Sequence, residues 1–85
     1  MQEIQYAKQI RDFVVQNFLF GEVEALQDDT SFMQSSIIDS TGILELVTFL
    51  ETTYGIKMED EEMIPDNLDS IKNVSRFLER KIGNN

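Results

Sequence analysis

The stretch that decides the fold reads Ile38-Asp39-Ser40-Thr41-Gly42-Ile43-Leu44-Glu45-Leu46-Val47. Asp39 or Ser40 can cap a helix here, because a side-chain oxygen at this position accepts a hydrogen bond from a backbone amide of the first turn. Apolar residues then recur at helical spacing as far as Tyr54, and Gly55 stands where many helices end in a left-handed residue. The stretch therefore predicts an amphipathic helix over Ser40–Tyr54 that begins with an exposed serine hydroxyl.

Two more amphipathic helices are expected on either side of this one. Residues from about Glu3 to Phe18 carry apolar side chains every three or four positions, and so do residues from Ser70 to Ile82. Residues 56–69 alternate apolar and acidic side chains and predict a short helical turn. The expected fold is all-α, a small bundle of three main helices with a short fourth.

A long loop should join the first two helices. Residues 19–38 lose the helical period and are rich in Asp, Ser and Thr, which favour local side-chain hydrogen bonds over helix. Three apolar residues interrupt this polar setting, and we expect them to hold the loop against the core: Phe32, Ile37 and Ile38.

The composition limits the range of functions. The chain has 85 residues, a net charge of −9 and 41% hydrophobic residues, which is enough for one core and one domain over residues 1–85. It contains no Cys and no His, and so lacks a thiol nucleophile, the usual general base and the commonest metal ligands. The acids do not form the loop of an EF-hand. A non-catalytic binding protein with no metal site is therefore expected.

Most of the negative charge lies in the middle of the chain. Residues 39–69 hold nine acids and a single base, Lys57. This segment predicts either a solvated helix face or a docking surface for a basic partner, and it argues against nucleic-acid binding. No apolar run reaches the length of a membrane span, and the first residues lack the pattern of a signal peptide. A cytoplasmic monomer is expected.

Residues 38–47, together with the helix order, length and charge, resemble the acyl carrier proteins, a family that includes peptidyl and aryl carrier domains. The family motif is Asp-Ser-Leu-x-x-Val-Glu-Leu or a near variant. This chain keeps Asp39, Ser40, Glu45 and Leu46, with Leu44 in the Val position. The resemblance covers nearly the whole chain and implies a bundle of the acyl-carrier type.

The resemblance implies that a phosphopantetheinyl transferase attaches 4′-phosphopantetheine to Ser40, assisted by Asp39. The thiol of this arm would carry acyl groups as thioesters, so the reactive sulfur would come with the cofactor. Enzymes that load or transfer acyl or aminoacyl groups would be the other partners, docking through basic surfaces. Their contacts would lie on the second helix and the acidic segment after it, at Thr41, Leu44, Glu45, Glu51, Asp60, Glu61 and Glu62.

The chain departs from the family pattern directly after the serine. Thr41 stands in place of the usual leucine, and Gly42 in place of the usual acid. Both changes touch the surface that partners would contact, which favours a specialised carrier over the general carrier of fatty-acid synthesis.

Two other functions remain open from the sequence. One keeps the chemistry and changes the cargo: an aminoacyl or peptidyl carrier that is loaded by an adenylating enzyme. The other is an unmodified acidic adaptor, in which Ser40 only caps a helix. Modification by a transferase would exclude the adaptor, and loading with amino acids or with fatty acids would separate the two carriers.

Overall fold

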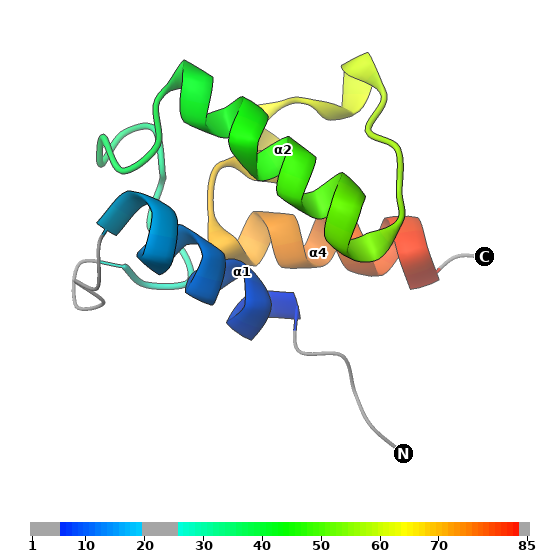
Figure 1. Ribbon diagram of the computed structural model, residues 1–85, viewed down its shortest axis with the longest axis horizontal. Coiled ribbons are helices and arrows are strands. Elements are labelled where there is room, and N and C mark those ends of the chain that lie inside the picture. Colours follow the sequence, from blue (N-terminus) through cyan, green and yellow to red (C-terminus); the bar gives the residue numbers. More distant parts are fainter. Residues whose placement is uncertain (1–5, 20–25, 84–85) are drawn as a thin grey trace.

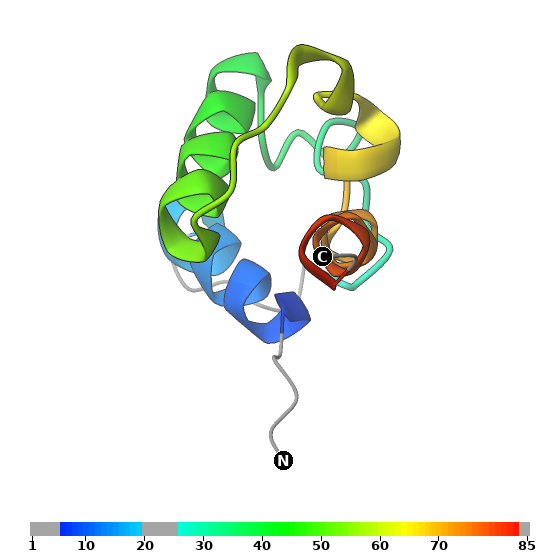
Figure 2. The same ribbon diagram turned by 90° about the vertical axis from the view of Figure 1, so that its right-hand side faces the viewer.

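The helices of the chain enclose one apolar core, with α2 and α4 on opposite sides of it and α1 between them (Figures 1 and 2). The computed structural model describes residues 6–19 and 26–83. Its elements are α1 (Tyr6–Val14), a π-helical turn η1 (Val15–Leu19), α2 (Ser40–Tyr54), a 3₁₀ turn η3 (Asp60–Glu62), α3 (Pro65–Leu68) and α4 (Ile71–Gly83). The described ranges contain helices and turns but no strand, and this confirms the all-α bundle.

The ends of α2 are set by the residues that the sequence singled out. Asp39 is the N-cap, and its Oδ1 accepts a hydrogen bond of 2.8 Å from the amide of Gly42. At the other end Gly55 adopts φ 64°, a left-handed conformation that suits glycine. Leu46, Val47 and Leu50 are buried on one face. The predicted boundaries and the core-facing stripe of this helix are therefore confirmed.

The first helix differs from its prediction at the C-terminal end. Ile10 and Val14 are fully buried, as the stripe requires, but the α-helix ends at Val14 and the chain continues as the π-helical turn. The side-chain amide of Asn17 donates to the carbonyl oxygen of Phe13 at 2.8 Å, and this is the oxygen that the Asn17 backbone amide would use in an α-helix. The side-chain bond thus uses part of the hydrogen-bonding capacity of this oxygen at the point where the wider turn begins. The predicted start at Glu3 lies outside the described residues.

A row of aromatic rings joins α1 to α2. Phe13 stacks on Phe49 with centroids 4.2 Å apart, and Tyr6 and Tyr54 meet edge to face at 5.4 Å. Phe49 also contacts Tyr54, and Phe13 contacts Phe18, in edge-to-face geometry. Burial raises the pKa of the Tyr54 hydroxyl, and the nearby Tyr6 adds to this effect. These contacts fix how the two helices lie against each other.

The loop before α2 is held to the core as predicted. Phe32 and Ile38 are buried and Ile37 is half-buried. The amide of Phe32 donates to the backbone oxygen of Asp69 at 2.8 Å, and the Asp69 carboxylate accepts from the Ser31 hydroxyl at 2.5 Å and the Met33 amide at 2.9 Å. Asp69 therefore joins the loop to the start of α4.

The acidic stretch after α2 forms two short helices where one was expected. The chain turns back through η3 and α3 to reach α4 (Figure 1). Ser70 caps α4 by accepting a hydrogen bond of 3.0 Å from the amide of Asn73. On α4 the residues Ile71, Val74, Phe77 and Leu78 are buried, as the periodicity predicts. Within the described ranges, no helix combines the length and apolar character needed to cross a membrane.

Candidate functional site

Ser40 is the first residue of α2, and it is exposed. The amide of Gly42 is bonded to Asp39 Oδ1 and that of Ile43 to the Asp39 backbone oxygen, at 2.8 and 3.0 Å. The amides of Ser40 and Thr41, as the first two of the helix, have no intrahelical acceptor. An anionic group on the serine would therefore lie at the positive end of the helix dipole, beside two available N–H donors.

Asp39 stands directly before the serine and is exposed. Its Oδ1 is used by the helix cap, while Oδ2 has no hydrogen-bond partner among the described residues. No group of three His, Cys, Asp or Glu side chains that could hold a metal ion occurs in residues 6–19 and 26–83. Asp39 thus presents one exposed carboxylate oxygen next to Ser40.

An apolar groove of about 230 Å³ opens beside Ser40. Four large apolar side chains are exposed in the described part of the chain, and three of them, Met33, Met63 and Ile64, line this groove. The complete lining comes from the loop, the first turn of α2 and the α3 region: Met33, Ser40, Ile43, Met63, Ile64, Pro65, Leu68 and Asp69. A flexible group attached to the serine could rest in it. The sequence indicated no groove, although it placed Met63 and Ile64 within an acidic stretch.

The remaining exposed apolar side chain is Leu44, which keeps 60% of its surface in contact with solvent. It lines a shallow hollow with Glu45, and Glu45 also lines a second hollow with Asp39 and Thr41. All four side chains are exposed, so the structure brings together the predicted contact residues at the start of α2. Asp60 and Glu61 are also exposed, but they lie on η3 and line neither hollow.

Two of the predicted contact residues are engaged inside the molecule. Glu51 is half-buried, and its Oε2 accepts a hydrogen bond of 2.9 Å from the amide of Met58. Glu62 accepts from the Lys81 ammonium at 2.9 and 3.1 Å and from the Glu59 amide at 2.9 Å. Both carboxylates hold the segment between α2 and α4, which leaves them less available to a partner than Glu45.

The hydrogen bond from the Glu59 amide, aided by Lys81, lowers the pKa of Glu62. Unfolding removes these contacts, so the unfolded chain takes up a proton at Glu62 at a higher pH than the folded chain does. The stabilisation from this group is complete above its ordinary pKa of 4.5 and is lost as the pH falls through the lower folded value. We expect Glu62→Gln to lower the melting temperature above pH 5, and this difference from the parent to shrink in acid.

Thermal unfolding followed by circular dichroism between pH 3 and pH 7 would measure this difference. Glu61→Gln is the matched control, since Glu61 is the exposed neighbour and has no hydrogen bond or ion pair within the described ranges. A difference between parent and Glu62→Gln that stays constant across this range would contradict the assignment.

Gly42 has a packing role that the sequence did not reveal. It is buried, and a Cβ atom added to it would lie 2.7 Å from Ile38 Cγ2 and 2.8 Å from Phe18 Cε1. These distances are well below van der Waals contact, so the loop and the π-helical turn approach α2 closely only because residue 42 is glycine. The contact with Phe18 joins residues 24 positions apart, so no local pattern could have indicated it.

The fold and site define a small acidic α-helical protein whose second main helix begins with an exposed Asp39-Ser40 pair. The chain is 27% identical over 67 residues to the probable acyl carrier protein PigG of Serratia sp. (strain ATCC 39006), in an alignment that covers 79% of this chain and 77% of the relative. This similarity supports a relationship to the acyl carrier protein family, as the resemblance predicted. No protein-family model matches the chain.

Proposed function

We propose that the chain is a non-catalytic acyl carrier in which Ser40 bears 4′-phosphopantetheine. The observation that carries this proposal is the exposed Ser40 hydroxyl at the first position of α2, beside an apolar groove and two helix amides that have no acceptor within the helix. The group would supply a thiol that holds acyl intermediates as thioesters. Such a carrier would work in the cytoplasm, in a fatty-acid, polyketide or other specialised biosynthetic pathway.

The residues around Ser40 suit the proposed group. The amides of Ser40 and Thr41 can donate to a phosphate oxygen, and the helix dipole favours its negative charge. The unpaired Oδ2 of Asp39 can contact a metal ion held by the transferase during attachment. The groove lined by Met33, Met63 and Ile64 can cover the apolar parts of the arm or of a short cargo.

Partner enzymes would dock on the start of α2 with basic surfaces. Leu44 offers an apolar contact and Glu45 a carboxylate without a partner in residues 6–19 and 26–83, while Asp60 and Glu61 extend the acidic surface along η3. A single exposed ion pair contributes about 0.2–1 kcal/mol, so several must act together. Weak and rapid docking of this kind suits a carrier that visits several enzymes.

An aminoacyl or peptidyl carrier is the second candidate, because the exposed Thr41 fits a specialised carrier of either cargo. A hydroxyl at this position replaces the apolar contact that the general fatty-acid carriers present. Adenylating enzymes that load amino acids and synthetases that load fatty acids, supplied in parallel to the modified protein, would identify the cargo by mass.

Intact-mass measurement tests the carrier proposal directly. After incubation with coenzyme A, Mg²⁺ and a broad-specificity phosphopantetheinyl transferase, we expect the parent protein to gain the mass of one phosphopantetheine. Ser40→Ala should gain nothing, whereas the control Ser35→Ala, which changes an exposed serine of the preceding loop, should gain as the parent does. A parent that the transferase leaves unmodified would favour the acidic adaptor, and a gain that persists in Ser40→Ala would contradict attachment at Ser40.

A further inference from the structure

Helix α4 carries four of the seven bases of this acidic chain. Two of them have internal partners: Arg80 donates to Asn67 Oδ1 at 3.0 Å, and Lys81 binds Glu62. The other two, Lys72 and Arg76, are exposed, and no acceptor within the described ranges pairs with either side chain. Neither the fold nor the proposed carrier function uses these two charges.

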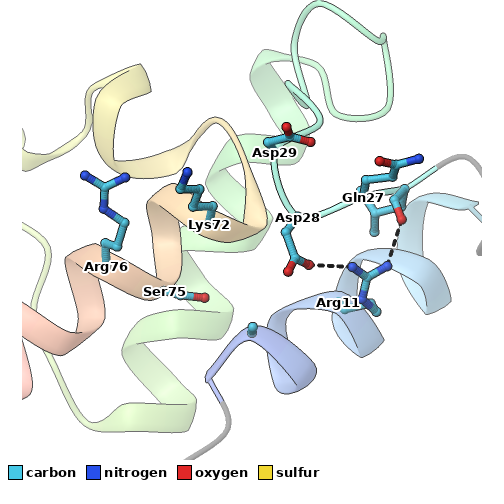
Figure 3. Close-up of a pocket in the computed structure, with 9 residues that line it drawn as sticks. Arg11, Gln27, Asp28, Asp29, Lys72, Ser75 and Arg76 are labelled. Atoms are coloured by element: carbon cyan, nitrogen blue, oxygen red, sulfur yellow. Dashed lines mark hydrogen bonds and ion pairs between the residues drawn. The ribbon is translucent and has the colours of Figure 1, made fainter.

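Lys72 and Arg76 stand one turn apart on α4 and extend from the same side of the helix (Figure 3). They line a shallow basin of about 740 Å³ between α4, α1 and the segment Leu26–Asp29, and they also line a smaller neighbouring hollow of about 220 Å³. The two hollows therefore meet at this pair of cations.

The other charged groups of the basin are arranged differently. Arg11 of α1 is used internally, since it donates to the Leu26 backbone oxygen at 2.8 Å and to Asp28 Oδ1 at 2.5 Å (Figure 3). Asp28 is thereby neutralised, and its backbone oxygen also accepts from the Lys72 amide at 2.8 Å. Asp29 is exposed and has no partner among the described residues. The basin thus offers two unpaired cations beside one unpaired carboxylate.

This basin lies away from the start of α2. Helices α2 and α4 are on opposite sides of the core, and Figure 3 views the basin with α4 in front and α2 behind. None of the residues that line the basin also lines the Ser40 groove or the hollows around Glu45. The smaller hollow shares only Asp69 with the Ser40 groove, and the Asp69 carboxylate is held there by Ser31 and Met33. A molecule bound at the basin would leave Ser40 accessible.

We propose that Lys72 and Arg76 form a second docking surface, which binds a carboxylate-bearing segment of a partner protein. The planar guanidinium of Arg76 can take a carboxylate through two hydrogen bonds, and Lys72 can bind a second carboxylate one helical turn away. A segment with acids spaced one turn apart matches these cations. The surface acts independently of Ser40 and of any group attached there.

The surrounding charge selects a short acidic segment over a longer polyanion. Nucleic acid or an anionic membrane would bring many negative charges across Asp29 and towards a chain with a net charge of −9. A protein segment presents two carboxylates locally and can avoid Asp29 or place a donor against it. The partner is therefore a protein with an acidic helix or loop. The charges are opposite to those at α2, where this chain is acidic and the expected partner surface is basic.

A titration followed by two-dimensional ¹⁵N–¹H NMR at low salt tests the proposal. The probe is a synthetic alanine-based helical peptide with glutamates one turn apart. We expect saturable shifts at Asp29 and at residues 72–76, and about tenfold weaker binding by Lys72→Gln/Arg76→Gln, from the loss of two exposed charge pairs. Asp29→Asn should bind the same peptide about twofold more tightly, because it removes the one unpaired carboxylate of the basin.

The matched control is Lys8→Gln/Lys57→Gln, which removes two exposed bases elsewhere and changes the net charge equally. It should bind within about twofold of the parent. Equal weakening in both double variants, shifts confined to α2, or no saturable shift would overturn the proposal. It would also be overturned if phosphatidylglycerol vesicles or DNA shifted the α4 amides and the peptide did not. Mass gain at Ser40 should be unchanged in Lys72→Gln/Arg76→Gln, which separates this result from the carrier proposal.

Discussion

Phe32→Ala is expected to lower the free energy of unfolding by about 3–5 kcal/mol, because it removes a fully buried ring and leaves a cavity that the core can only partly close. Natural domains gain about 0.05–0.15 kcal/mol per residue on folding, so a chain of 85 residues has about 4–13 kcal/mol in total. One substitution in a loop would therefore remove a large part of the stability. Urea unfolding followed by far-UV circular dichroism measures the change.

The adjacent Met33→Ala provides the control. Met33 keeps 45% of its surface exposed, so its truncation should change the free energy of unfolding by less than about 0.5 kcal/mol. The two residues share the loop and are both hydrogen-bonded to Asp69 through their amides, so backbone effects are matched. A loss below about 1 kcal/mol in Phe32→Ala would contradict the burial of this ring and the fixed position of the loop before Ser40.

Local signals made most of the fold predictable from the sequence. The start and end of α2 depend on Asp39 and Gly55, whose effects act within one helical turn. The buried faces of α2 and α4 follow from periodicity alone. The apolar side chains of the loop lie among polar residues, so packing against the core was the expected way for them to leave water. The position of Ser40 at an exposed helix start could be predicted for the same reason.

The features that escaped prediction depend on contacts between distant residues. The engagement of Glu62 follows from Lys81, which lies 19 positions away. The groove beside Ser40 likewise combines a loop, a helix start and the α3 region. Counting charges in the sequence predicts the sign of the net charge of each segment. Only the structure shows that Arg80 and Lys81 have partners whereas Lys72 and Arg76 have none among the described residues.

Gly42→Glu is the second substitution with a large expected effect. It introduces the acid that acyl carriers commonly have at this position, and judged from helix propensity and the helix dipole alone it should stabilise α2. The structure predicts the opposite, because the new Cβ would meet Ile38 Cγ2 at 2.7 Å and Phe18 Cε1 at 2.8 Å. Ile38 is 1% exposed and has no room to move. Overpacking of this kind costs about 1–3 kcal/mol.

Thr41→Glu is the control that places the same acid one residue earlier, on an exposed position of the same turn. It should be close to neutral, since the helix dipole favours the new acid while Glu45, four residues further on, repels it. Phe18→Ala should reduce the cost of Gly42→Glu by removing one of the two clashing groups, and a double-mutant cycle in urea would measure this coupling. If Gly42→Glu proved as stable as Thr41→Glu, packing would not require a glycine at position 42. The residue would then matter only for the surface that partners are expected to contact. A cost relieved by Phe18→Ala would show that packing against the π-helical turn keeps an acid out of this position.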